Sequence, residues 1–213
     1  MTVRVLVTGF TPFPGAPVNP TEHLIGHFER HAPRIASDAA FRFAVLPVEY
    51  GSAVEALEEA AGTFDPHVAI HFGLADEAAG FRLERLARNA ITAPKPDNTG
   101  RLPEAGEIFR GGGPVRSTLP LDEMAETLRA LNLPVEWSDD AGGYLCNYVF
   151  YHSAAALCRR VRAVMSGFVH VGPVALPGDD ARDDMLDFAG LVAGAEAILS
   201  VCAARMASAA DPD

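Results

Sequence analysis

A cysteine, a histidine and a glutamate stand in sequence contexts from which they could perform nucleophilic catalysis. Cys146 lies where a glycine-containing turn gives way to an apolar stretch that is typical of a helix. A helix start presents unpaired N–H groups and a positive dipole end, which favour a thiolate and could hold an oxyanion near the same sulfur. His170 lies toward the end of a short β-like run, as a general base would, and Glu84 upstream completes a possible Cys/His/acid set.

Each of these residue types also has an ordinary structural explanation. A lone cysteine at an apolar helix start is most often just buried, and we expect that of Cys158 and Cys202. A histidine in a strand is usually a satisfied core residue, and a strand glutamate is usually solvated. The residues by themselves therefore leave both catalysis and packing open.

Composition narrows the class of protein. The chain has 213 residues and no internal repeat, which predicts one domain over residues 1–213. Its 28 acidic and 17 basic residues give a net charge of −11, and the basic residues do not cluster, so nucleic acid is not an expected partner. We expect no apolar run of membrane-spanning length and no membrane partner. Three cysteines without a CxxC pair indicate neither a disulfide framework nor a thiolate zinc site, and they favour a reducing cytoplasm.

Strand-like and helix-like segments alternate along the chain. Strands are predicted over residues 3–8, 41–48, 68–74, 81–89, 135–138 and 168–171. Helices are predicted to begin near residues 19 and 52 and to cover residues 124–131, 146–161 and 183–206, with residues 207–213 as a flexible tail. This alternation predicts an α/β fold with a mostly parallel sheet covered on both faces.

Two helix starts carry capping patterns. Asn19 can cap the first helix, Pro20 is tolerated at its first position, and Glu22 completes a capping box. Ser52 with Glu55 repeats the pattern ahead of the second helix.

The strand predicted over residues 81–89 leads into a long loop. Its alternation would set Glu84 on the same side as Arg82, Leu86 and Arg88. Residues 92–120 follow, with five prolines and a run of three glycines. Because loops of this length are usually functional or mobile, we expect a flap over the site, the alternative being a solvent-exposed excursion without a role.

Three histidines recur every four residues along the first predicted helix. His23, His27 and His31 have the spacing that lets neighbouring imidazoles share a metal. No cysteine or HExxH motif accompanies them, and solvent-facing histidines are ordinary, so we predict no metal site.

Several segments, in order over most of the chain, resemble pyroglutamyl peptidase I, also called pyrrolidone carboxyl peptidase. The sequence Val-Thr-Gly-Phe-Thr-Pro-Phe-Pro-Gly over residues 7–15, followed by Val-Asn-Pro over residues 18–20, resembles the start of that family. Further similarity lies in the segments around Glu84, residues 96–100, residues 141–147 and residues 168–171.

The resemblance implies a fold, an activity and an assembly. It implies a three-layer α/β/α sandwich with a mostly parallel, mixed central sheet, in a cytoplasmic enzyme that is often a homotetramer and uses no metal or organic cofactor. The implied reaction removes an N-terminal pyroglutamyl residue from peptides. Cys146 would form a thioester with the substrate, His170 would act as base and acid, and Glu84 would orient the imidazole.

The same resemblance implies a substrate pocket. Phe10 and Phe13 would flank the flat pyrrolidone ring, Asn19 would lie at the pocket edge, and Tyr144 and Leu145 would complete the wall. Aromatic faces suit a small planar lactam, although two phenylalanines could equally pack within a turn.

Two positions depart from the family pattern. Leu74, in Gly-Leu-Ala over residues 73–75, replaces the usual glutamine of this pocket region. Pro94, with Lys95 beside it, replaces an arginine. Either backbone groups hold the lactam, or the substrate preference has drifted.

Two other function classes stay open. A family member without catalysis could bind capped N-termini or small lactams, which the altered pocket positions favour and the intact Cys146, His170 and Glu84 oppose. Nucleoside phosphorylases share a similar sandwich, so a phosphate-using transferase is conceivable on fold analogy alone, and insensitivity to thiol reagents would distinguish it.

Overall fold

A six-stranded mixed sheet forms the centre of the computed structural model, which describes residues 1–92, 95–179 and 185–210. The strand order is β2-β1-β3-β8-β4-β7. These strands are β1 (Val3–Phe10), β2 (Ala39–Leu46), β3 (Val68–Leu74), β4 (Phe81–Glu84), β7 (Val135–Ser138) and β8 (Met165–Val171). β1, β2, β3 and β8 are parallel, whereas β4 is antiparallel to β8 and parallel to β7. The predicted mostly parallel, mixed sheet is confirmed.

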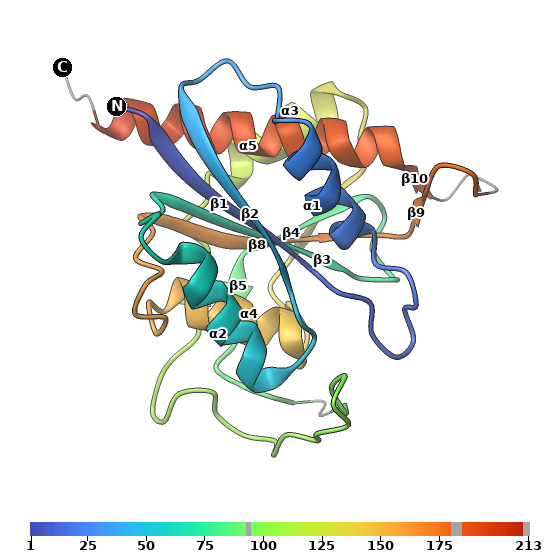
Figure 1. Ribbon diagram of the computed structural model, residues 1–213, viewed down its shortest axis with the longest axis vertical. Helices are drawn as coiled ribbons and strands as arrows, with labels where there is room; N and C mark the ends of the chain where they lie inside the picture. The colour runs from blue at the N-terminus through green and yellow to red at the C-terminus, as the bar shows by residue number, and fades with distance from the viewer. Residues whose placement is uncertain (93–94, 180–184, 211–213) are drawn as a thin grey trace.

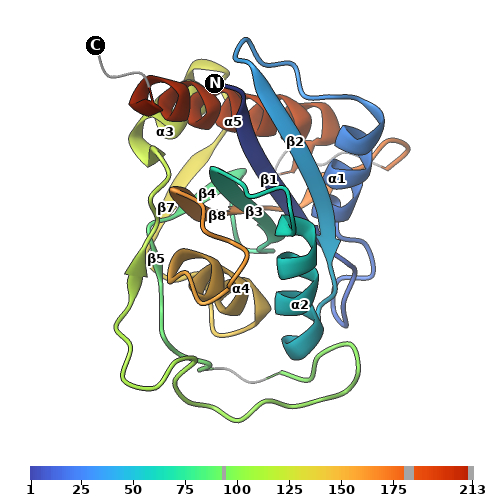
Figure 2. The same cartoon turned by 60° about the vertical axis from the view of Figure 1, so that its left-hand side comes forward.

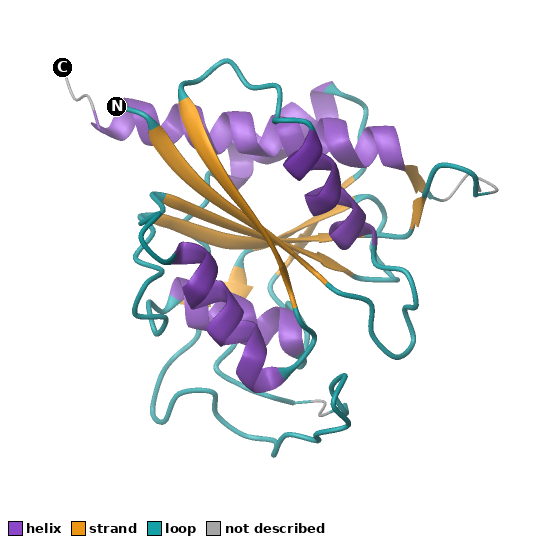
Figure 3. Cartoon of the chain, in the orientation of Figure 1, coloured by secondary structure: helices purple, strands orange, loops and turns teal. Residues whose placement is uncertain are grey.

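Helices cover both faces of this sheet (Figures 1 and 3). On one face lie α2 (Tyr50–Ala61) and α4 (Leu145–Ala154), and on the other α1 (Pro20–Arg30), α3 (Leu121–Ala130) and α5 (Phe188–Ala210). Figure 2 shows the two helical layers with the sheet between them. Two further sheets of two short strands each lie outside the central sheet. One pairs β5 (Leu86–Ala87) with β6 (Val115–Arg116), and the other pairs β9 (Val174–Ala175) with β10 (Leu186–Asp187). The fold is the expected three-layer α/β/α sandwich.

Alternation along the central strands divides the core into two clusters. Val3, Val5 and Val7 of β1 pack toward α1, α3 and α5, whereas Leu6 and Phe10 pack toward α2 and α4. Because both faces of the sheet are buried, the strands appear in the sequence as nearly continuous apolar runs.

The first helix begins at the predicted Asn19 cap, whereas the second begins elsewhere than predicted. The Asn19 side chain accepts a hydrogen bond from the Thr21 N–H, with Pro20 in the first turn of α1. α2, by contrast, begins at Tyr50, so the predicted cap at Ser52 is wrong. The Tyr50 N–H donates to the carboxylate of Asp97 at 3.2 Å, so a residue far along the chain supplies the cap.

The strand predicted over residues 81–89 is broken at Arg85. The Arg85 N–H donates to the Ser138 carbonyl, its own carbonyl accepts from the Ser117 N–H, and the chain then leaves the central sheet to form the β5–β6 ribbon. Arg82 and Glu84 do share a face, but Arg88 lies beyond the break and pairs with Asp140. The single-strand prediction is therefore wrong.

α4 ends earlier than predicted. It stops at Ala154 because Ala156 adopts a left-handed conformation, with φ of 54°, and the following N–H groups turn back to the His152 carbonyl.

α5 differs from expectation in its bounds and its length. It starts at Phe188 and extends to Ala210, so residues 207–210 are helical rather than part of a tail, while residues 211–213 lie outside the described residues. Its stretch Phe188–Ala209 has a mean hydropathy of 1.5 and is long and apolar enough to cross a membrane, against expectation. Leu191, Ile198 and Leu199 of this helix are fully buried against the sheet, as in the core helix of a globular domain.

A chain of buried polar side chains crosses the sheet beneath α4. His71 Nδ1 lies 2.8 Å from Thr8 Oγ1, and His71 Nε2 lies 2.9 Å from Ser153 Oγ, which in turn lies 2.8 Å from Ser166 Oγ. Burial lowers the pKa of His71 to about 3, so this ring stays neutral and links β1, β3, β8 and α4 through hydrogen bonds.

Replacing His71 should change how stability depends on pH. The unfolded chain protonates this histidine near pH 6.5, whereas the native protein does not until about pH 3, so stability is lost as the pH falls. His71→Gln should remove a slope of about 1.4 kcal/mol per pH unit, measured by urea unfolding from pH 6.5 downward. His23→Gln, at an exposed position, is the control, and equal slopes in all three proteins would contradict the assignment.

Candidate active site

The predicted site residues lie together at the carboxyl ends of the central strands. β1, β3 and β8 are parallel and end close together, and a cavity of about 220 Å³ opens there beside the start of α4. We call it the reactive cavity. Its lining includes Cys146 and His170 with the predicted Phe10, Phe13, Asn19, Leu74, Tyr144 and Leu145, and also Val48, Asp76, Lys95 and Ala141, which were not predicted as site residues.

Glu84 and His170 form a buried pair. Glu84 Oε1 lies 2.8 Å from His170 Nδ1, and the two residues are 0% and 5% exposed. The antiparallel pairing of β4 with β8 sets Arg82 opposite His170, which brings Glu84 next to the ring on the same face. Arg82 itself pairs with Glu136 at 2.9 Å, so His170 alone balances the Glu84 charge among the residues that the structure describes.

Cys146 reaches His170 from the helical layer that contains α2 and α4. It is the second residue of α4, and no side chain caps this helix start within the described chain. Gly73 is the sheet neighbour of His170, and a Cβ added there would lie only 3.0 Å from the Cys146 sulfur and 2.7 Å from the Phe168 ring. A glycine is therefore needed on β3 for the sulfur to sit this close to the sheet.

The charges of the site favour an imidazolium. Burial alone would lower the pKa of His170, but the charge of Cys146, together with the hydrogen bonds that the ring donates to Cys146 and Glu84, raises it to about 9. Since Nδ1 faces Glu84, Nε2 is the ring atom that remains for the sulfur. The arrangement can hold a thiolate beside an imidazolium, which is the reactive form of a cysteine nucleophile.

The other two cysteines lie in different environments. Burial raises the pKa of Cys158 to about 12 and that of Cys202 still further, and both side chains are fully buried. Cys146 is partly exposed.

Asn147 was missed as a site residue although it directly follows the nucleophile. Its Oδ1 accepts from the Arg88 N–H at 2.8 Å, and its Nδ2 donates to the carbonyls of Arg88 and Ala90. These three bonds fasten the first turn of α4 to the segment that follows Glu84. The only sequence signal was its place in the segment that resembles the family.

Ion pairs fix the turn that precedes Cys146. Arg85 binds Asp139 through two nitrogens, and Arg88 pairs with Asp140. The Asp140 carboxylate also accepts from the Gly142 N–H, where φ of 84° suits glycine.

Of the two phenylalanines predicted to form the wall of the pocket, one is buried and the other is accessible. Phe10 is 2% exposed and packs against Phe168, whereas Phe13 is partly exposed. Asn19 lines the cavity, but its Oδ1 already accepts from Thr21 and its Nδ2 donates to the Thr11 carbonyl. Its polar atoms thus hold the turn that carries both phenylalanines.

The first residues of the long loop form part of the wall of the reactive cavity. The Tyr144 hydroxyl donates to the Pro96 carbonyl, the Asn98 side chain donates to the Pro12 carbonyl, and Lys95 lines the cavity. The departure at Pro94 lies outside the described residues, and the flap stays a prediction.

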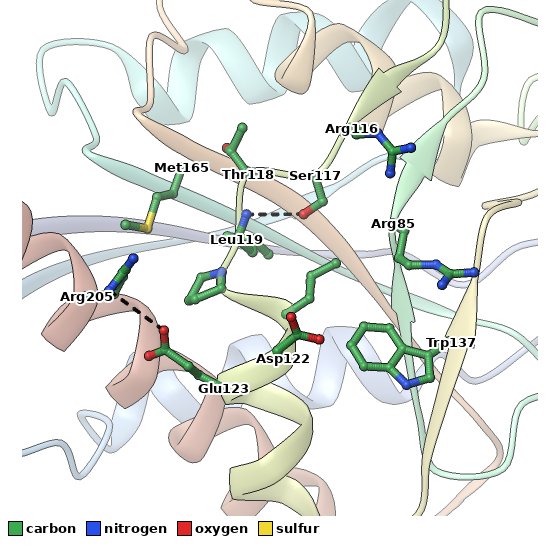
Figure 4. Close-up of a pocket in the computed structure, with 12 residues that line it drawn as sticks. Arg85, Arg116, Ser117, Thr118, Leu119, Asp122, Glu123, Trp137, Met165 and Arg205 are labelled. Atoms are coloured by element: carbon green, nitrogen blue, oxygen red, sulfur yellow. Dashed lines mark hydrogen bonds and ion pairs between the residues drawn. The ribbon is translucent and has the colours of Figure 1, made fainter.

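A second cavity, of about 430 Å³, lies at the far edge of the sheet (Figure 4). Its lining includes arginines and carboxylates, among them Arg205, which pairs with Glu123, and the Leu119 N–H donates to Ser117 Oγ. Among its described lining residues there is no cysteine or histidine, and these residues offer no nucleophile and base pair of the kind found in the reactive cavity.

The three histidines predicted on the first helix do not line the reactive cavity, and His31 lies just beyond the end of α1 rather than in it. His27 and His31 are in ring contact at 4.9 Å. Across the described part of the chain, no three His, Cys, Asp or Glu side chains gather as a metal site would require.

Comparison with known proteins identifies close relatives. The model of the pyroglutamyl peptidase family matches residues 3–196. Pyrrolidone-carboxylate peptidase from Pyrococcus furiosus is 40% identical over 170 residues, covering 79% of this chain and 80% of that protein. The protein of the same name from Thermococcus litoralis is 35% identical over 170 residues, covering 79% and 76%. A crystal structure of the P. furiosus pyrrolidone carboxyl peptidase superposes with a TM-score of 0.84 at 33% identity, covering 96% of this chain and 100% of that one.

Thiol alkylation should single out Cys146. At neutral pH we expect iodoacetamide to modify it at least about tenfold faster than Cys158 or Cys202, because a thiolate reacts and a buried thiol does not. His170→Ala should slow this reaction, since the imidazolium that supports the thiolate is lost. Peptide mass spectrometry measures the three rates, and protein unfolded in guanidinium, where all three should react alike, is the control.

Proposed function

Because the chain belongs to the pyroglutamyl peptidase family of cysteine peptidases, we propose that it removes the N-terminal pyroglutamyl residue from peptides, with Cys146, His170 and Glu84 as its catalytic residues. The observation that carries this proposal is the buried contact between Glu84 and His170 at the wall of the cavity into which Cys146 projects.

The first half of the reaction forms a thioester. The Cys146 thiolate attacks the carbonyl carbon of the pyroglutamyl bond, and the resulting oxyanion lies near the free N–H groups at the start of α4. When the intermediate collapses, the C–N bond breaks and His170 gives its Nε2 proton to the leaving amine. Glu84 holds the ring orientation and stabilises the imidazolium.

The second half hydrolyses the thioester. His170, now neutral, takes a proton from a water molecule, and the water oxygen adds to the thioester carbonyl. The C–S bond then breaks, which returns the Cys146 thiolate beside the His170 imidazolium, and the product leaves as pyroglutamic acid, which loses its carboxyl proton to the solvent.

The lining of the reactive cavity suits an uncharged ring. Phe10, Phe13 and Leu74 present apolar surface, against which a planar lactam can pack. A free N-terminal ammonium would lose its hydration there without gaining a matched partner from these three side chains. Since the Leu74 side chain has no polar atoms, hydrogen bonds to the N–H and C=O of the lactam have to come from backbone groups or from the other polar side chains of the lining.

The alternative functions have weaker support. A binder of capped N-termini would have no use for a nucleophile, a base and a buried acid in one cavity, and Leu74 is the departure that favours it. The phosphate-using transferase rests on fold analogy alone. The homotetramer and the cytoplasmic location stay predictions, and light scattering of the purified protein tests the first.

A fluorogenic assay tests the proposed activity. Wild-type protein should release aminomethylcoumarin from its pyroglutamyl amide and leave prolyl and alanyl amides intact. Cys146→Ser and His170→Ala should each lower kcat/KM by on the order of 10³-fold or more, since the nucleophile and base act as a unit. Cys158→Ala, which removes a cysteine outside the cavity, should keep most of the activity. Hydrolysis of the prolyl amide at a similar rate would reject the assignment.

The pH profile should report on the buried pair. With the pKa of His170 raised to about 9, kcat/KM should fall above that pH as the imidazolium loses its proton. Glu84→Gln removes one cause of the raised pKa, so the alkaline limb should move about one unit lower. Glu126→Gln, which removes an exposed carboxylate from α3, should leave the limb in place. A limb unmoved by Glu84→Gln would show that this carboxylate does not act on His170.

A further inference from the structure

A third cavity adjoins the reactive cavity and shares two residues with it. It has a volume of about 240 Å³, and Leu74 and Asp76 line both spaces. The turn between β1 and α1 also serves both, because Phe13 borders the reactive cavity and Ala16, bonded to it across the turn, borders the other. The two cavities are therefore neighbours, separated by Leu74 and Asp76.

The chemistry of the leaving group points in the same direction. His170 must face the nitrogen that departs, so the peptide beyond the scissile bond lies on the imidazole side of the reactive cavity. The chain that follows His170 provides Pro173, Val174 and Leu176, and all three line the adjoining cavity. The adjoining cavity is thus where the first residue after pyroglutamate would lie.

The walls of the adjoining cavity are held in place. The Ala75 N–H donates to the Val171 carbonyl, which ties the turn bearing Asp76 to the end of β8. On the other side, Leu176 donates its N–H to Asp179 Oδ2 at 3.0 Å, and β9 pairs with β10. The two carboxylates therefore stand on fixed backbone.

The charge and polarity of the adjoining cavity favour one kind of side chain. Val18, Val174 and Leu176 give it apolar surface, whereas Asp76 and Asp179 are exposed carboxylates at its rim. Among its described lining residues there is no lysine or arginine, and Lys95 lines only the reactive cavity. A long side chain with a cationic end can lay its methylene groups on the apolar surface and bring its charge to the carboxylates.

We propose that the adjoining cavity is a subsite for the residue that follows pyroglutamate and that it selects lysine or arginine there. This inference rests on the proposed function, because it assigns the leaving peptide of that reaction. The proposal adds no covalent step. It concerns only the relative kcat/KM values of different pyroglutamyl peptides.

The test compares peptides that differ at one position. Three pyroglutamyl peptides with Lys, Gln or Glu as the second residue are mixed, and mass spectrometry gives their relative kcat/KM. Wild type should prefer Lys over Gln by about threefold to fivefold, as expected for an exposed ion pair, and Gln over Glu. The preference should shrink at high salt, where exposed charges are screened.

Two variants and a control locate the effect. Asp179→Asn leaves Asp76 in place and should lower the Lys-to-Gln ratio, and Val18→Lys, which places a cation at the rim without touching the Asp179 contact, should turn the preference toward Glu. Asp122→Asn removes the same charge from the start of α3, in the lining of the cavity of Figure 4, and should leave the ratio unchanged. Because each value is a ratio within one sample, partial loss of folded protein does not alter it.

The outcomes separate the two proposals. If wild type cleaves the pyroglutamyl coumarin amide but treats Lys, Gln and Glu peptides alike, the subsite is rejected and the proposed function stands. A preference for Lys that persists in both Asp179→Asn and Val18→Lys also rejects it. If no pyroglutamyl substrate is cleaved, the proposed function itself fails.

Discussion

The buried ion pair between Glu84 and His170 is the interaction on which the rest of the site depends. Burying a carboxylate is costly unless a partner balances it, and here the imidazole lies 2.8 Å away while Glu84 is fully buried. The antiparallel pairing of β4 with β8 is what sets this carboxylate beside the ring. Glu136 also matters to this contact because it binds Arg82. An unpaired Arg82 guanidinium would compete with His170 for the Glu84 carboxylate.

The scaffold brings the nucleophile to this pair from a separate layer. α4 packs across the sheet, and its first turn is fastened to the strand segment after Glu84 by the three hydrogen bonds of Asn147. Gly73 leaves the space above β3 that the sulfur occupies. The acid, the base and the nucleophile thus come from β4, β8 and α4, and hydrogen bonds between these segments fix their mutual positions.

Two histidines on one face of the sheet show how environment sets protonation. His71 and His170 both contact the Phe168 ring, with centroids 6.3 Å and 4.7 Å away. His71 faces hydroxyl groups, and burial lowers its pKa to about 3, whereas the Cys146 charge and Glu84 raise that of His170 to about 9. The neutral His71 ring therefore links strands to α4 through hydrogen bonds, whereas the charged His170 ring lines the reactive cavity.

The sequence by itself determined the α/β class, the alternation of elements and the Asn19 cap, because these follow from apolar periodicity and local hydrogen bonding. It also indicated Cys146, His170 and Glu84, through their local contexts and a family resemblance. Only the tertiary structure decided the break after Glu84, the start of α2 at Tyr50 and the meeting of Glu84 with His170. In each case the deciding partner is distant along the chain: Asp97 lies 47 residues from Tyr50, and Glu84 lies 86 residues from His170. Local patterns record the propensity of a segment, but contacts of this range arise only when separate strands and loops pack together.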